Sequence, residues 1–143
     1  MFGNEGCFVS FDLMVFDKKT APREKDDFLK WYKDCCKWEE DHSYDDYRIL
    51  PKEMQDFYLE LIQTFPPMNG EYAPSEDEME DDFTLESRMT DYSIGHHCIY
   101  GAFSWSMAEL AFTTVYELAQ KHFIGFFNAS NPDFEIHFND QKK

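Results

Sequence analysis

Three adjacent residues, His96, His97 and Cys98, form the cluster best suited to chemistry in this chain. Imidazole and thiolate groups bind zinc, and a cysteine activated by a histidine can act as a nucleophile. However, no second pair of ligands follows at a familiar spacing, and consecutive residues of a strand point to opposite faces. We therefore expect a hairpin turn with solvated histidines here, and predict neither a metal site nor a catalytic thiol.

An acidic run, "PSEDEMEDDF", is the second candidate for chemistry, since six of its residues carry carboxylates. A calcium-binding EF-hand loop needs acids at alternate positions and a glycine midway, and this run has no glycine. Carboxylate pairs for glycoside chemistry carry no information in a chain with 29 acids. No Ser-nucleophile, P-loop, dinucleotide-binding or zinc-protease motif is present. The sequence thus predicts no catalytic residue, no cofactor and no enzyme activity.

The same acids have aromatic and apolar neighbours, which is the composition of a surface for a basic protein. Charges steer such a partner and rings anchor it. We predict a binding surface on two segments, a first acidic loop over residues 39–47 and an acidic segment over 71–90. Its residues are Trp38, Tyr44, Asp45, Asp46, Tyr47, Glu76, Asp77, Glu78, Met79, Glu80, Asp81, Asp82 and Phe83. The alternative is that the acids are only solvated and the rings fold back onto the core.

The charge balance supports a basic partner. The chain has 143 residues and a formal net charge of −16, from 29 acids and 13 bases. Between Glu24 and Asp91 there are 21 acids and 7 bases, so this middle part carries −14. An acidic surface repels nucleic acid and anionic membranes, because both carry phosphate charges. We expect a basic protein partner, no nucleic acid and no membrane.

The hydrophobic pattern predicts the elements that position these segments. Alternating apolar residues in "CFVSFDLMVFD" indicate a central strand, and an apolar stripe indicates a helix over 22–38 opened by Pro22. A second helix follows Pro51, with a stripe reaching Phe65. Residues 71–90 show no period and are expected to be a loop or lid. Two short strands flank Gly95-His96-His97, and a capping box in "SMAE" starts a helix that runs to about His122. Its inner face is expected to hold Leu110 and Ala111. "IGFFNA" and "FEIHF" are further strands, the last with Glu135 and His137 facing outward, and 139–143 is a tail.

These elements predict one α+β domain over residues 1–143. Their order is β-α-α-loop-β-β-α-β-β, with about five mainly antiparallel strands and three helices packed on the sheet. The strand-helix-strand unit from Cys98 to Ala129 can place two strands in parallel, with a right-handed crossover. The start of the chain has no signal-peptide pattern, and no run of about 18 apolar residues occurs. We expect a cytoplasmic protein whose four cysteines are free thiols.

Several stretches together resemble a known group of proteins. "FDLMVFD", "FPPMNG", "DYSIG", "AFSW" and "IGFFNAS…FEIHF" look like segments of small acidic bacterial proteins. Some of these resemble immunity proteins, which neutralise the toxins of contact-dependent and other polymorphic toxin systems. The resemblance implies a non-enzymatic inhibitor that acts by tight binding. It carries no functional residue across, since such families use different surfaces for different toxins.

Three hypotheses of function follow. The favoured one is an immunity protein that binds a basic toxin, for example a nuclease. The second is a small enzyme or small-molecule binder with a pocket near Tyr92–Trp105, where Tyr92, His96, His97, Tyr100 and Trp105 are the polar candidates. The third is a structural or regulatory subunit that dimerises through an aromatic face of the sheet.

Overall fold

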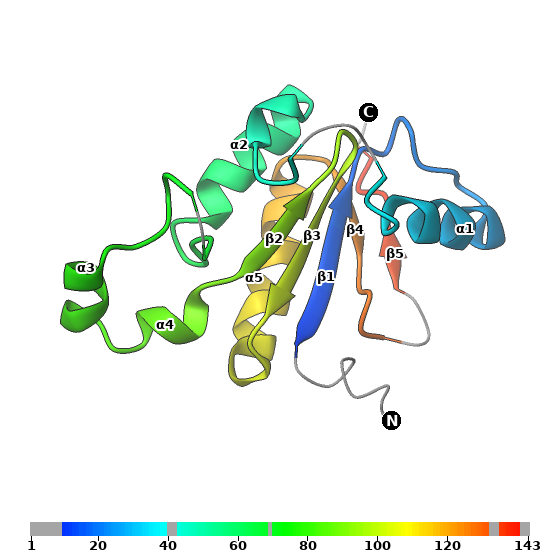
Figure 1. Cartoon of the computed structure of the whole chain (residues 1–143). Coiled ribbons are helices and arrows are strands. Elements are labelled where there is room, and N and C mark those ends of the chain that lie inside the picture. The colour runs from blue at the N-terminus through cyan, green and yellow to red at the C-terminus, as the bar shows by residue number, and fades with distance from the viewer. Residues whose placement is uncertain (1–9, 40–42, 69, 132–134, 141–143) are drawn as a thin grey trace.

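A strand with apolar residues on both faces lies at the centre of the fold. The computed structural model describes residues 10–39, 43–68, 70–131 and 135–140. Strand β1 (Phe11–Phe16) is the middle of a five-stranded sheet with the order β2-β3-β1-β4-β5, and every neighbouring pair is antiparallel (Figure 1). The other strands are β2 (Asp91–Ile94), β3 (Cys98–Phe103), β4 (Gly125–Phe127) and β5 (Ile136–His137). The predicted α+β class, strand number and central strand are confirmed.

The predicted strand-helix-strand unit runs from β3 through α5 (Ala108–Lys121) to β4. Both strands pair antiparallel with β1, so they run parallel to each other on its two sides. The connection therefore crosses over β1, and α5 packs on β1 and β4. A short 3₁₀ turn, η3 (Trp105–Met107), joins β3 to this helix.

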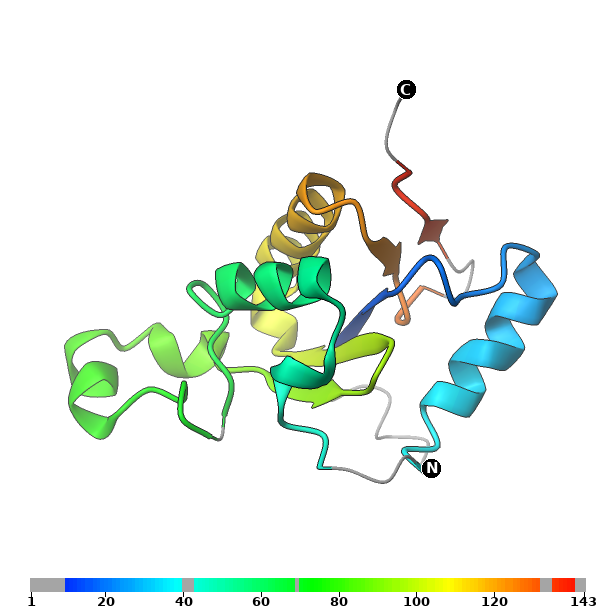
Figure 2. The same ribbon diagram turned by 90° about the horizontal axis from the view of Figure 1, so that it is seen from above.

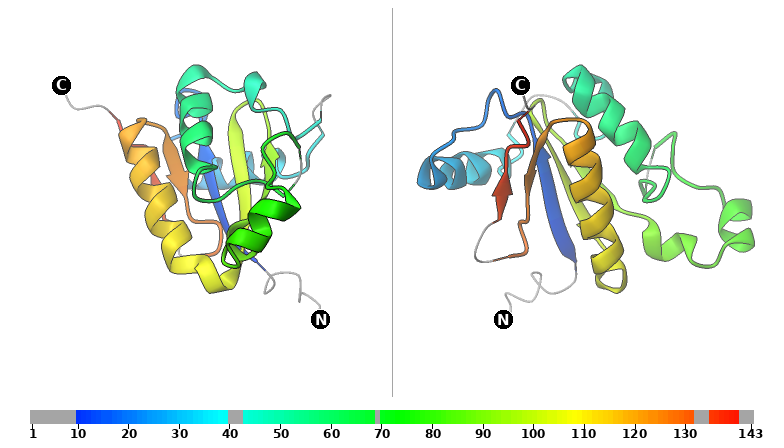
Figure 3. Two further views of the ribbon diagram at one scale, coloured as in Figure 1. Left: turned by 90° about the vertical axis from the view of Figure 1, so that its left-hand side faces the viewer. Right: turned by 180° about the vertical axis from the view of Figure 1, so that it is seen from behind.

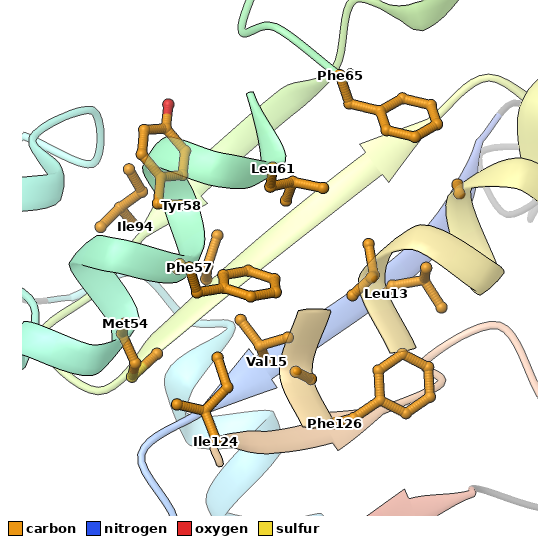
Figure 4. Packing of buried hydrophobic residues seen from close by; sticks show 14 of the residues in the cluster. Leu13, Val15, Met54, Phe57, Tyr58, Leu61, Phe65, Ile94, Ile124 and Phe126 are labelled. Atoms are coloured by element: carbon orange, nitrogen blue, oxygen red, sulfur yellow. The ribbon is translucent and has the colours of Figure 1, made fainter. Parts of the chain in front are cut away.

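Helices cover both faces of the sheet (Figure 2). Helix α2 (Lys52–Leu61) and α5 lie on one face, over a cluster that includes Val15, Phe57 and Phe126 (Figure 4). Helix α1 (Lys25–Cys35) covers the other face. There the ring of Phe16 contacts Phe28 at a centroid distance of 4.9 Å. Alternate residues of β1 thus supply two cores, which is why its sequence is apolar on both sides.

In this second core, strands β1 and β4 approach each other closely at a glycine. Phe16 lies opposite Gly125 in the β1–β4 pairing, and its ring occupies the space that a Cβ at position 125 would fill. A side chain there would displace a fully buried ring. Gly125 is therefore required by packing, because the backbone approaches the ring too closely for any other residue.

The helix boundaries differ from the predicted ones. Helix α1 begins at Lys25, because the carboxylate of Glu24 caps it by accepting a hydrogen bond from the Asp27 N–H. Pro22 belongs instead to the preceding turn. The helix ends at Cys35, and Trp38, predicted to be helical, has a positive φ of 52°. Helix α2 ends at Leu61, one turn before the predicted stripe ends, and Phe65 lies buried beyond it.

Residues 71–90, expected to be a loop or lid, contain two short helices that were not predicted, α3 (Glu76–Asp81) and α4 (Leu85–Arg88). A capping box starts α3: Ser75 accepts from the Glu78 N–H at 3.2 Å, and Glu78 accepts from the Ser75 N–H at 2.8 Å. The capping box predicted at Ser106 is absent, because η3 precedes α5 and the N-cap is Met107 without a side-chain bond. Acids in the first turn of α3 also interact favourably with the helix dipole.

One predicted face was also wrong. Leu110 was expected inside but is exposed, whereas Ala111, Val115 and Ala119 are buried on α5. His137, expected to face outward, has a side chain that is 37 % exposed, and its ring also lies 5.2 Å from that of Tyr116 on α5. In the tail, Asn139 and Asp140 are held by hydrogen bonds to the body. No helix among the described residues is long and apolar enough to cross a membrane.

Candidate protein-binding site

The segment over residues 71–90, called the arm from here on, projects away from the sheet (Figures 1 and 3). Its two ends are joined where it leaves the body. Pro67 and Thr90 form a parallel β-bridge, in which the Thr90 N–H donates to the Pro66 carbonyl at 2.8 Å and the Met68 N–H to the Thr90 carbonyl at 3.1 Å. Thr90 is fully buried. Both ends of the arm are therefore attached to the body next to this hydrogen-bonded bridge.

A clasp around Arg88 holds α4 to the body. Its guanidinium donates to the Thr64 carbonyl at 2.6 Å and to the Asp82 carboxylate at 2.8 Å. The Asp82 carboxylate also accepts from the N–H and the hydroxyl of Thr84. These hydrogen bonds, first from Thr84 and then from Arg88, lower the pKa of Asp82. Because Asp82 joins α3 to α4, the clasp fixes the direction of α3.

Helix α3 carries the acids of "PSEDEMEDDF" to the far end of the arm. Glu76, Asp77, Glu80 and Asp81 are exposed, and none of them forms an ion pair with any described residue. Met79 is half-buried, whereas Phe83 is 90 % exposed. An exposed phenylalanine contributes almost nothing to folding stability, because its side chain stays in water in the folded protein. The structure therefore brings unpaired carboxylates together with one projecting ring.

The rings of the first acidic loop face the body instead. Trp38 packs on the core cluster under α1, 5.2 Å from the ring of Tyr44 and 6.2 Å from that of Tyr100. The Tyr44 carbonyl accepts from the N–H of Ile94 at 2.9 Å, which ties the loop to β2. These two rings lie where the alternative prediction placed them, against the protein itself.

The end of this loop is ordered by the short helix η2 (Tyr47–Ile49). Asp46 caps η2 and also pairs with Arg48 at 2.9 Å, and these hydrogen bonds lower the pKa of Asp46. The ring of Tyr47 stacks on Tyr58 at 5.7 Å and contacts Tyr72, in the arm, at 6.1 Å. The loop thus supports the base of the arm. Asp45 stays exposed there, at the rim of a small groove whose other wall includes Met68 and Asp91.

The polar residues of the proposed pocket near Tyr92–Trp105 do not converge. Tyr92 lies on the α2 face and donates to the Phe65 carbonyl at 2.7 Å, while Tyr100 lies on the α1 face and donates to Asp12. Trp105 packs on Phe11 at 5.3 Å. The cavity next to Tyr92 measures about 10 Å³ and has an apolar lining, so it offers about the space of a single water molecule and is too small for a ligand.

The histidine cluster forms the predicted hairpin turn between β2 and β3. His96 and His97 are exposed, Cys98 is buried, and His97 lies 3.3 Å from both Asp17 and Thr20. Among the residues that the structure describes, no group of three or more His, Cys, Asp or Glu side chains could hold a metal ion.

A network of polar side chains lies under α1, and the sequence analysis did not predict it. Tyr100 donates to Asp12, Tyr32 interacts with both Tyr100 and Cys36, and Ser10 donates to Asp12 at 2.6 Å. Burial raises the pKa of the Cys36 thiol to about 11 and that of Tyr32 to about 12. A thiol with a raised pKa is a poor nucleophile near neutral pH. This network of polar side chains stabilises the packing of α1 on the sheet. Its members come together only through contacts between residues far apart in the sequence.

The rings proposed for dimerisation through a sheet face belong largely to the cores, because Phe16, Phe126 and Phe127 are buried in the two clusters. Comparisons of the chain with protein-family models, with curated proteins and with solved structures gave no match.

Proposed function

We propose that this protein binds a basic protein through the arm and neutralises it by direct contact. The observation that carries the proposal is the exposed Phe83 beside four unpaired carboxylates on α3. Interfaces concentrate their binding energy in a few anchors, often aromatic, that become fully buried in the complex. Carboxylates around such an anchor accelerate the encounter with a positively charged partner and select against acidic ones.

The arm is suited to this role by its construction. The bridge at Thr90 and the clasp at Arg88 hold it in place before binding, so less conformational entropy is lost in the complex. The arm has eight acids and one base, a net charge of −7. Asp45, exposed at its base, extends the acidic surface toward the first acidic loop.

The partner class that fits best is a basic toxin domain, with this protein as its cytoplasmic immunity protein. The sequence resemblance to small acidic immunity proteins supports this assignment. A nuclease toxin fits the charge requirement, because an enzyme that binds phosphates carries a basic surface. An arm that occupies this surface would compete directly with the nucleic acid.

The experiment compares two variants of equal charge. The arm variant carries Glu76→Gln, Asp77→Asn, Glu80→Gln and Asp81→Asn, which leaves the capping residue Glu78 and the clasp residue Asp82 intact. The control variant carries Asp26→Asn, Asp27→Asn, Glu109→Gln and Glu117→Gln, four exposed acids on α1 and α5. Basic proteins captured from a host lysate by the native chain are purified and titrated with the native chain and with both variants.

We expect the arm variant to bind the purified partner about tenfold or more weakly, with a shallower salt dependence, while the control variant stays close to the native chain. Phe83→Ala should weaken binding as well, without changing the salt dependence. A partner whose affinity is indifferent to the arm variant would show that the arm is not the docking surface. Failure to capture any basic protein would contradict the proposed function itself.

A further inference from the structure

A hollow with basic lining lies at the end of the molecule where α5 ends and α1 begins. It measures about 620 Å³, and the residues around it include Lys18, Lys19, Arg23, His122, Phe123 and Asp140. The connection between β1 and α1, the end of α5 and the C-terminal segment meet there, at the top of Figure 1, away from the arm. In a chain of net charge −16, such a site is not explained by the general charge balance.

A carboxylate already occupies this groove. Asp140 accepts two hydrogen bonds from Arg23, at 2.9 and 3.0 Å, and lies 3.7 Å from the Lys18 ammonium. The planar guanidinium matches a carboxylate in this two-pronged geometry, and here the group that it binds is a carboxylate. Arg23 is held in place by the ring of Phe138, 4.1 Å below its guanidinium. The hydrogen bond to Arg23 lowers the pKa of Asp140.

The cations also have contacts other than the carboxylate. The side chain of Lys18 is only 18 % exposed and donates to the Asn139 carbonyl at 3.0 Å, while Asn139 itself donates to the Ile124 carbonyl at 2.9 Å. Asp140 is 56 % exposed and is the last described residue of the chain. Exposed ion pairs contribute little to folding. Asp140 is therefore a weakly held occupant of a site built by other contacts.

Phe123 at the groove has an unfavourable backbone conformation. It follows the last turn of α5 with φ of 57°, and the Ile124 N–H donates to Ala119 while the Phe123 N–H donates to Gln120. This is the Schellman pattern, in which the left-handed position favours glycine. The Phe123 ring is 41 % exposed and belongs to neither core cluster. The Lys18 ammonium lies 5.8 Å from the centre of the Phe123 ring, and a left-handed backbone at an exposed aromatic residue points to a functional role.

We propose that this groove binds an acidic segment of another protein, with a carboxylate on Arg23 and Lys18 and a neighbouring apolar side chain against Phe123. Asp140 occupies the carboxylate position until that segment displaces it. The site is separate from the arm and does not depend on the function proposed for it. The other carboxylate at the groove, Glu53, restricts the site to one acidic group at a time.

The test is a titration with a blocked Asp-Phe dipeptide, which carries one side-chain carboxylate and one apolar ring, followed by NMR of the full chain. We expect peak shifts around Arg23 and Phe123. Asp140→Asn removes the internal competitor, whose effective concentration is in the millimolar range, and should tighten binding roughly tenfold. Arg23→Gln should abolish binding, and Lys52→Gln, at an exposed lysine on α2, is the matched control that should change nothing.

Three results would overturn the proposal: binding that Arg23→Gln retains, binding that Asp140→Asn leaves unchanged or weakens, and inorganic phosphate that binds as tightly as the peptide. Phe123→Gly separates folding from recognition, since glycine suits the left-handed position. It should keep or raise the thermal midpoint and weaken the peptide at least threefold. A fall in the midpoint with unchanged binding would show that the ring is structural.

Discussion

The first acidic loop and the arm have the same composition but opposite structures. Both place acids next to aromatic residues, and both were predicted to bind the same partner. In the loop, the rings of Trp38 and Tyr47 pack on the body, and Asp46 is used as a cap. In the arm, Phe83 projects into solvent, and most of the acids have no partner among the described residues. The loop therefore supports the base of the arm, whereas the arm exposes its ring and its acids to solvent.

This contrast shows which property distinguishes a docking surface from a structural loop. Acid content does not, because both segments have it. The distinguishing property is whether the ring is already buried in the free protein, since only a ring that is still exposed can gain burial on binding. Substitutions in the two sets of rings therefore test whether this difference in burial holds.

The largest effect on the free energy of unfolding is expected for a substitution in the first acidic loop. Tyr47→Ala removes a ring that stacks on Tyr58 and contacts Tyr72, and should lower the free energy of unfolding by about 2 kcal/mol. Urea denaturation measures this change. Tyr47→Phe, which keeps the ring, is the control and should cost less than about 1 kcal/mol. A loss below about 0.5 kcal/mol for Tyr47→Ala would mean that the loop is not a support.

A smaller and local effect is expected in the arm on acidification. The pKa of Asp82 is lowered below its ordinary value of 3.8, so the ionised form is favoured in the folded state. The stabilisation is present above the unfolded pKa and is lost as the pH falls through the folded pKa. The Cα chemical shifts of α3 and α4 should therefore move toward coil values below about pH 3.8, while those of β1 stay native.

Asp82→Asn is the matched control for this acid effect. The variant should show a less ordered arm already at neutral pH and little further change of the arm on acidification. If the shifts of α3 in the native chain stay constant down to pH 2, the clasp between Asp82 and Arg88 does not determine the order of the arm.

The smallest effect on the free energy of unfolding is expected for a substitution of Phe83. Because the side chain is 90 % exposed, Phe83→Ala should change the free energy of unfolding by no more than about 0.5 kcal/mol. The same urea titration checks it, and the variant also serves in the binding experiment. A loss above 1 kcal/mol would place the ring in a contact with the body and remove the contrast with Tyr47.

The sequence was sufficient to predict the sheet and its three packed helices. Alternation along β1 and the stripes of α1, α2 and α5 reflect burial, which is the strongest pattern that a sequence carries. It was not sufficient to place the capping box. "SEDE" and "SMAE" both fit the motif, but only "SMAE", which an apolar run follows, was predicted to be a capping box. In the structure, Trp105 packs on Phe11 and a 3₁₀ turn takes the place of the cap.

The candidate site was predicted in part. The acids of α3 were identified, but nothing in the sequence distinguished the exposed Phe83 from the half-buried Met79, since both interrupt the same acidic run. The clasp joins Arg88 to Thr64, 24 residues earlier, and the groove joins Arg23 to Asp140, 117 residues later. Such pairs depend on tertiary packing and have no local pattern. Only the positive φ at Phe123 identifies that residue, and backbone angles are not visible in a sequence.

The bridge between Pro67 and Thr90 also bears on how the protein could change over evolution. Because the two ends of the arm already meet, the entropy of closing this segment depends only weakly on its length. Insertions, deletions and exchanges between these ends would leave the sheet and both cores untouched. The body can thus act as a constant platform on which arms of different length and charge are exchanged, so that a new partner requires no new fold.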